Sequence, residues 1–247
     1  MVGMLVWKTP QTGKREKGLL IRERNVLHMR LVCAEILCGG KTPEAVVRRR
    51  VRLAVKRLQR MGIRQVVLPE HFPWKGLLEQ GGIQPVSTVP LRQMLAADWV
   101  RWNLKERNIP AGGARVAILA DRMTGAVVRT VTELALRHRY VMLKVSYGGE
   151  DLSSQLRREY GVTLLLNPNR EQIESADCVV LFEKQAGEYG KRKICLYEEE
   201  AELPQLLLPP ALEDYLPPGM DRPQMLTVLM EAGILRPGQI AFQGRDF

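Results

Sequence analysis

The sequence predicts an α/β protein in which a Rossmann-like, doubly wound parallel-sheet domain follows a smaller, basic α/β domain. Short apolar segments alternate with helical patterns from residue 115 to residue 197, which is typical of a parallel sheet with helices on its faces. Residues 1–110 hold 21 Lys and Arg against 8 Asp and Glu, whereas residues 191–247 hold 6 against 9. The Pro- and Gly-containing run 108–113 separates the two halves.

These features predict three parts of the chain. We expect a basic α/β domain with a bridging helix over residues 1–110 and a Rossmann-like domain over residues 111–200. The acidic, Pro-rich tail 201–247 is expected to pack across a domain surface with a short helix from Pro223 to Ala232.

Composition and charge limit the class of protein. The 247 residues are 45% hydrophobic and 26% charged, which is ordinary for a globular protein. The formal net charge is +10, and the basic front half can attract a phosphate-bearing ligand, nucleic acid or an acidic macromolecular partner. No apolar run approaches the ~20 residues needed to cross a bilayer, and the start of the chain lacks a signal-peptide pattern, so we expect a cytoplasmic protein. The four cysteines lack paired metal-ligand spacing and are interpreted as buried thiols, so no metal site is expected.

The first elements of the chain are only partly specified by pattern. Met4–Trp7 is a strand candidate, and the polar stretch Thr9–Lys17 after it predicts a hairpin. Residues 18–38 contain two apolar runs that periodicity does not assign to helix or strand, and the paired glycines at 39 and 40 end them.

The clearest helix is predicted from Pro43 to Arg60. Thr42 is the expected cap, and Pro43 and Glu44 suit the first turn. An apolar stripe at helical spacing is opposed by a cationic face. The stripe consists of Val47, Val51, Ala54, Val55 and Leu58, and the cationic face of Arg48, Arg49, Arg52, Lys56, Arg57 and Arg60.

A short buried strand at 63–68 is followed by the polar loop 69–75, and loops at the carboxyl end of a strand commonly build ligand crevices. Residues 81–88 offer another strand, and residues 90–107 predict one long helix. In the second half we expect strands at 115–120, 140–146, 162–166, 178–182 and 193–197, with helices at 125–138, 150–160 and 169–175.

The most informative motif is a near miss at the first strand of the Rossmann-like domain. In the G-x-G-x-x-G fingerprint, glycines make a tight turn, let the backbone approach the pyrophosphate and let the helix pack on the strand. Here those positions hold Ala120, Arg122 and Gly125. One interpretation is that Arg122 and Thr124 contact a phosphate or carboxylate in place of glycine backbone. The other is that Asp121 caps the helix and Arg122 is a solvated charge.

The second strand of this domain bears on the choice of cofactor. An acidic residue at its end normally holds the ribose hydroxyls of NAD, and no carboxylate occurs there before Glu150, so NAD is disfavoured. Lys144, Ser146 and Tyr147 tolerate a 2′-phosphate, which leaves NADP as a weak option. The alternative is a strand edge followed by a glycine turn.

Two further candidates lie in the basic half. Glu70 and His71 with Lys75 form a possible acid and base set, although adjacent residues on an extended segment point in opposite directions. The basic helix 43–60 suits nucleic acid by charge, but it has no aromatic residue for stacking, so a solvated face or one docked on an acidic surface is favoured.

We therefore favour a degenerate Rossmann-like protein that acts as a binding or regulatory module without redox catalysis. One alternative is an enzyme that binds NADP or another phosphorylated ligand between the two lobes, with His71 or Lys75 facing Arg122. The second alternative is nucleic-acid binding through the helix 43–60.

Overall fold

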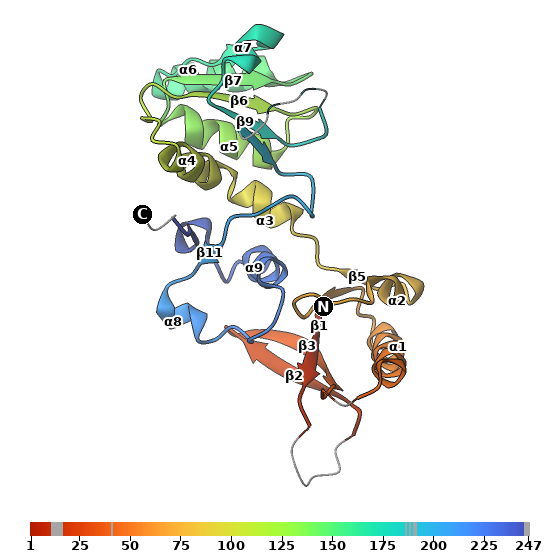
Figure 1. Cartoon of the computed structure of the whole chain (residues 1–247). Helices are drawn as coiled ribbons and strands as arrows, with labels where there is room; N and C mark the ends of the chain where they lie inside the picture. The colour runs from red at the N-terminus through yellow and green to blue at the C-terminus, as the bar shows by residue number, and fades with distance from the viewer. Residues whose placement is uncertain (11–16, 41, 186, 188, 190–191, 245–247) are drawn as a thin grey trace. The chain divides into compact units, whose positions relative to one another are not determined.

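The computed structural model describes residues 1–10, 17–40, 42–185, 187, 189 and 192–244 (Figure 1). The chain divides into two compact units. The N-terminal unit consists of Met1–Thr88 and Leu208–Gln239, and the Rossmann-like unit consists of Val89–Leu207 and Ile240–Phe247. Each unit is therefore built from two separate stretches of sequence, whereas the sequence pattern predicts contiguous domains with a boundary near residue 110.

The Rossmann-like unit contains a five-stranded parallel sheet with the order β10-β9-β6-β7-β8. Its strands are β6 (Arg115–Leu119), β7 (Tyr140–Lys144), β8 (Leu165–Leu166), β9 (Cys178–Leu181) and β10 (Lys193–Cys195). Numbered 1 to 5 in chain order and counted from β8, these strands read 3-2-1-4-5, which is the doubly wound order. The predicted Rossmann-like α/β fold is confirmed.

Helices cover both faces of this sheet. They are α5 (Gly125–Ala135), α6 (Gly149–Tyr160) and α7 (Arg170–Glu174). The core on one face joins alternate strand residues such as Ile118 and Leu143 to α5 and α6. The core on the other face joins Leu119 and Met142 to Ile173 of α7. In Figure 1, α5 lies on one side of the strands of this sheet and α7 on the other. Burial on both faces explains why these strands are continuously apolar.

The predicted helix over residues 90–107 is wrong in one respect, because two helices replace it. α3 (Val89–Met94) and α4 (Ala96–Glu106) are separated at Leu95, which has φ −94° and ψ 5°. Trp99 and Val100 of α4 are buried in the core that also contains α5. This burial places the predicted bridging helix in the Rossmann-like unit and accounts for the boundary at residue 88 rather than 110.

The N-terminal unit contains a second sheet with the order β2-β3-β1-β4-β5. The strands are β1 (Gly3–Lys8), β2 (Leu19–Val26), β3 (Met29–Leu37), β4 (Gln65–Val67) and β5 (Gln84–Pro85). The predicted hairpin between Met4–Trp7 and the next element is wrong, because β1 pairs in parallel with β3 and β4. The turn residues 11–16 lie outside the described residues.

The antiparallel hairpin of this unit joins β2 to β3 instead, over the residues whose structure the pattern left open. Its two-residue turn holds Leu27 at φ 46° and His28 at φ 69°. Positive φ at both central positions is the geometry of a type I′ turn, which Asn and Gly adopt most easily. The sequence therefore carries no recognisable turn signal here.

Helix α1 (Glu44–Arg60) follows β3, and α2 (Lys75–Gln80) follows β4. The predicted apolar stripe of α1 is confirmed, since all five of its residues are buried. The prediction that Thr42 caps the helix is wrong: Pro43 occupies the N-cap position, and the Thr42 hydroxyl accepts a hydrogen bond from the Gly39 backbone N–H at 3.1 Å.

The C-terminal segment returns to both units. It forms α8 (Pro210–Glu213), α9 (Arg222–Glu231), the 3₁₀ turn η2 (Pro237–Gln239) and a two-stranded sheet of β11 (Leu206–Leu207) and β12 (Ala241–Phe242). Leu68 N–H donates to Gln224 Oε1 at 2.9 Å, and Asp221 N–H donates to Leu68 O at 2.8 Å. These bonds attach α9 to the end of β4 and explain why the tail is not a separate part.

Among the described residues, no helix combines the length and the apolarity that spanning a bilayer requires.

His138 at the end of α5 gives the stability of the Rossmann-like unit a pH dependence. It is buried, and its Nδ1 lies 3.0 Å from the Ala111 carbonyl oxygen. Burial lowers the pKa of His138 below its ordinary value of 6.5. The unfolded chain therefore takes up this proton at a higher pH than the folded chain, and stability falls as the pH drops below 6.5.

We expect the denaturant midpoint of the wild-type protein to fall between pH 7.5 and pH 5.5, and the fall to be smaller in His138→Gln. Chemical denaturation at four pH values measures this, with His71→Gln as the control because His71 is exposed. An equal pH dependence in wild type and His138→Gln contradicts the assignment.

Candidate functional site

The candidate site lies at the carboxyl edge of the parallel sheet in the Rossmann-like unit. In the sheet, β6 lies between β7, which is the next strand in the chain, and β9, which comes later in the chain. The strand order thus reverses between β6 and β9, and ligands of open α/β sheets bind in the crevice outside such a reversal. The loop after β6 holds Asp121, Arg122 and Thr124, and the loop after β9 begins with Glu183.

Hydrogen bonds join the two loops at the position where a dinucleotide fold binds the phosphates of its cofactor. The Asp121 backbone N–H donates to Glu183 Oε2 at 2.9 Å. The Gln185 side-chain amide donates to Asp121 Oδ1 at 2.6 Å. We name Asp121, Glu183 and Gln185 the crevice network. It supplies two carboxylates and occupies one backbone donor at the place where a dinucleotide fold leaves its backbone open.

The predicted candidates on the loop after β6 have distinct roles. Thr124 is the N-cap of α5, and its hydroxyl accepts a hydrogen bond from the Val127 N–H at 3.3 Å. The interpretation that Asp121 caps this helix is therefore wrong, since Asp121 bonds to Gln185. Arg122 is exposed, and a Cβ built on Gly125 would meet no atom within 4 Å. Gly125 is thus not required for close packing of helix on strand.

The loop after β7 is a glycine turn. Ser146 and Tyr147 are exposed, and Gly148 has φ +80°, a conformation that favours glycine. Gly149 begins α6, and a Cβ there would lie 3.0 Å from Val145 Cγ1. The first turn of α6 carries Glu150 and Asp151, whose charges complement the helix dipole themselves and oppose a second anion. The residues of this turn line a cavity of about 260 Å³.

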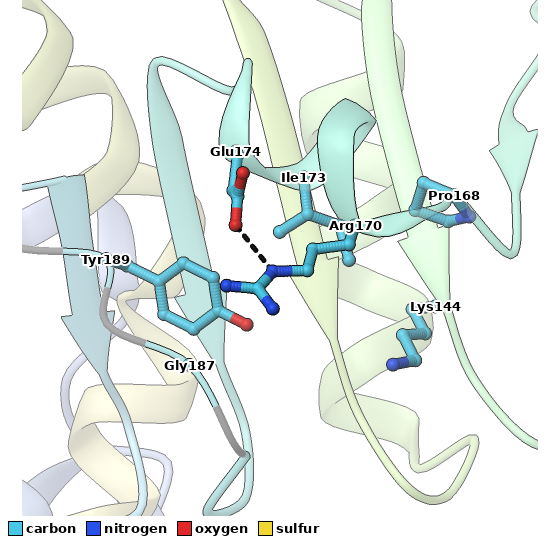
Figure 2. Close-up of a pocket in the computed structure, with 7 residues that line it drawn as sticks. All are labelled: Lys144, Pro168, Arg170, Ile173, Glu174, Gly187 and Tyr189. Atoms are coloured by element: carbon cyan, nitrogen blue, oxygen red, sulfur yellow. Dashed lines mark hydrogen bonds and ion pairs between the residues drawn. The ribbon is translucent and has the colours of Figure 1, made fainter.

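Lys144, the exposed last residue of β7, lines a different and larger cavity of about 610 Å³. Its other described walls come from the loop before α7, from α7 itself and from the connection between β9 and β10. These residues are Pro168, Arg170, Ile173, Glu174, Gly187 and Tyr189. Arg170 Nε donates to Glu174 Oε1 at 2.7 Å. Figure 2 shows the Arg170 and Tyr189 side chains pointing toward one another and the Lys144 amine directed toward the same space. We name this cavity the Lys144 pocket.

The predicted set in the basic half lies in the N-terminal unit. Glu70, His71 and Lys75 are all exposed, and His71 has φ 53°. The Glu70 backbone N–H donates to Gly219 O at 3.1 Å, and the C-terminal segment therefore occupies part of this loop. Within the described residues, no hydrogen bond or ion pair joins the three side chains, and a role facing Arg122 stays a prediction.

The four cysteines are free thiols with little exposure. Cys33, Cys178 and Cys195 are buried, and Cys38 is half-buried. Burial raises the pKa of Cys33 to about 11 and that of Cys178 to about 12, so these two thiols are protonated at neutral pH. In the part of the chain that the structure describes, no group of three His, Cys, Asp or Glu residues is placed to hold a metal ion.

Comparison with known proteins gives likenesses of fold. No family model and no curated protein matches the sequence. The chain is similar to L-tryptophan dehydrogenase from Nostoc punctiforme (14% identity, TM-score 0.29, covering 61% of this chain and 44% of that one). It is also similar to the catalytic subunit of M. jannaschii aspartate transcarbamoylase (14% identity, TM-score 0.30, covering 60% and 51%).

A third likeness is to shikimate 5-dehydrogenase from Listeria monocytogenes in complex with shikimate and NAD (10% identity, TM-score 0.27, covering 60% and 57%). The matched part thus spans about half the length of these structures. These likenesses concern the fold alone, and the fold assignment rests on the strand order.

The crevice network makes a prediction about local stability. Replacing Glu183 by Ala removes the acceptor of the Asp121 N–H, so hydrogen exchange at the Asp121 amide should accelerate. Because Glu183 is half-exposed, the loss of global stability should stay below about 1 kcal/mol. Exchange measured by NMR or mass spectrometry tests this. Lys184→Ala, a neighbouring exposed change, is the control, and equal exchange in both variants would mean that the bond is not maintained in solution.

Proposed function

We propose that the Rossmann-like unit is a binding or regulatory module without redox catalysis and that it does not take NAD or NADP in the dinucleotide position. The observation that carries the proposal is the crevice network: the Asp121 N–H is bonded to Glu183, and the Asp121 carboxylate is bonded to Gln185. A pyrophosphate would have to replace Glu183 as the acceptor and lie beside two carboxylates.

The loops on either side support the same conclusion. Gly125 opens α5, but Arg122 stands where the fingerprint requires a glycine for close backbone approach, and the Thr124 hydroxyl is already engaged as the helix cap. At the end of β7 the first carboxylates, Glu150 and Asp151, lie in the first turn of α6 rather than at the strand end. Neither the phosphates nor the ribose of NAD would meet its usual partner.

The direct test is a thermal-shift titration of the full chain with NAD, NADP, ATP and S-adenosylmethionine. A ligand of the folded state at 100 times its Kd adds about 2.7 kcal/mol of stability, so 1 mM of ligand reveals any Kd of about 10 µM or tighter. We expect no shift with NAD or NADP. A dose-dependent rise with either one that disappears in Arg122→Ala would overturn the proposal, and Arg137→Ala is the matched control because Arg137 is exposed beyond the end of α5.

The Lys144 pocket supports a second candidate function, the binding of a small anionic ligand on the α7 face of the sheet. Lys144 and Arg170 bring two cationic groups to one cavity, and the Tyr189 hydroxyl adds a hydrogen-bonding group (Figure 2). Glu174 neutralises only part of this charge through its bond to Arg170. Pro168 and Ile173 supply apolar walls, so the pocket suits an anion with an apolar body.

This candidate makes a separate prediction. If a compound in a screen of phosphorylated and carboxylated metabolites raises the melting temperature, Lys144→Ala should weaken its binding at least tenfold, because a charge-assisted contact is lost. Lys193→Ala, an exposed end residue of β10 outside the pocket, is the control. Binding that is unchanged in Lys144→Ala assigns the compound to another site, and a screen in which nothing binds contradicts this second function.

A further inference from the structure

A groove in the N-terminal unit runs between helix α1 and the edge strand β2. Its volume is about 620 Å³. The wall from α1 contains Val46, Leu53 and three arginines, and the other wall is the start of β2 from Gly18 to Ile21, with Lys17 beside it. Two of its arginines, Arg49 and Arg57, belong to the cationic face of the helix 43–60 that the sequence offers as a nucleic-acid site. The groove belongs to the unit that the proposed function does not use.

The wall from α1 combines exposed apolar groups with positive charge. Val46 and Leu53 are two turns apart on the same side of the helix and are 39% and 45% exposed, although a helix in water normally turns such side chains inward. Arg49 and Arg57 share this side of the helix. No ion pair in the described part of the chain neutralises Arg49 or Arg57. This wall therefore suits a ligand that is both apolar and acidic.

The other wall presents a strand edge that no second described strand pairs with. β2 is the outermost strand of its sheet and pairs with β3 alone among the described strands. The Leu37 N–H donates to Gly18 O at 3.1 Å, and bonded and non-bonded residues alternate along an antiparallel strand. The backbone N–H and C=O groups of Leu19 and Ile21 therefore point outward from the sheet edge, next to the groove.

Arg50 connects the two walls. Its guanidinium donates to the Leu37 carbonyl oxygen. A Cβ built on Gly18 would lie 2.5 Å from Arg50 Nε, so a larger residue at position 18 would require the Arg50 side chain to shift. The hydrogen bond joins α1 to the end of β3, and the Arg50 side chain lies against Gly18, next to the beginning of β2.

We propose that this groove binds an extended, acidic segment of a partner protein, which adds a strand to the outer edge of β2. Its backbone would pair with the outward groups of Leu19 and Ile21, as in other complexes formed by strand addition. Side chains on its helix-facing side would cover Val46 and Leu53, and its carboxylates would reach Arg49, Arg57 and Lys17. Main-chain pairing supplies affinity, and the apolar and cationic groups select the sequence.

A peptide fits the groove better than nucleic acid does. The outward backbone offers both donors and acceptors at strand spacing, which another strand matches and a phosphate backbone does not. Among the described residues, those that line the groove include no aromatic side chain on which a base could stack. A second copy of this chain is opposed by charge, because pairing two β2 edges would bring two α1 helices, each with seven Lys or Arg and one Glu, toward each other.

The experiment selects random decapeptides displayed on phage against the full-length protein, then measures the most enriched peptide by fluorescence anisotropy. We expect enrichment of Asp and Glu together with Val, Ile and Leu. The peptide should slow hydrogen exchange at the Leu19 and Ile21 amides, and methylation of its alternate backbone nitrogens should abolish binding.

Matched variants locate the contact. Arg49→Glu and Leu53→Asp should each weaken binding at least tenfold, whereas Arg52→Glu, the same charge reversal at an exposed position of α1 outside the groove, should change it less than threefold. All three variants should keep the wild-type helix content by circular dichroism, because Arg49, Arg52 and Leu53 are exposed.

Three results overturn the proposal. The first is that no peptide is enriched on the wild-type protein over the Arg49→Glu protein, and the second is that Arg49→Glu and Arg52→Glu weaken peptide binding equally. The third is that a ten-nucleotide oligouridylate displaces the peptide at an equal or lower concentration. The last result assigns the groove to nucleic acid. None of these outcomes depends on whether NAD or NADP binds, so the proposal and the proposed function of the Rossmann-like unit succeed or fail separately.

Discussion

The structure of the Rossmann-like unit depends on parallel pairing of β6 with both β7 and β9. Parallel strands place all their carboxyl ends at one edge, and the reversal of strand order beside β6 brings two sequence-distant loops together there. In this chain the loop after β6 and the loop after β9 meet where the Glu183 carboxylate accepts a hydrogen bond from the Asp121 backbone N–H. This bond lies at the edge of the sheet where dinucleotide folds bind their cofactor. The same constraint that builds the sheet therefore also brings Glu183 to the Asp121 backbone N–H.

Sequence patterns predicted this sheet well and the first sheet poorly, for physical reasons. Strands buried on both faces are continuously apolar, and the helices between them begin at residues such as Thr124 and Asn169 that cap a helix through their side chains. The hairpin of β2 and β3 has no such signal, because Leu27 and His28 adopt positive φ without being turn formers. The parallel pairing of β1 with β3 joins segments that no local pattern relates.

Of the two loops that form the candidate site, only the loop after β6 could be predicted from the sequence. The loop after β6 is recognisable because it replaces a known glycine motif, and the structure does place Arg122 and Thr124 at the carboxyl edge. Glu183 and Gln185 were missed, since their contacts with Asp121 span more than 60 residues. Glu183 follows a predicted strand directly, and that position was the available signal. The groove beside β2 could not be predicted for a different reason. Whether a strand lies at the edge of a sheet depends on which strands pair with it, and the sequence of residues 18–26 alone does not show this pairing.

The path of the chain between the two units has a consequence for how the protein can be divided. The polypeptide passes from one unit to the other after Thr88, again after Leu207 and once more after Gln239. A chain stopped at Leu207 would lack α9, which bonds to Leu68, and also β12, whose Phe242 stacks on Trp99 at 6.2 Å. Neither unit is complete until the residues after Leu207 have been synthesised, so the two are expected to mature together. A ribosome-bound chain without those residues would expose both unfinished cores at once.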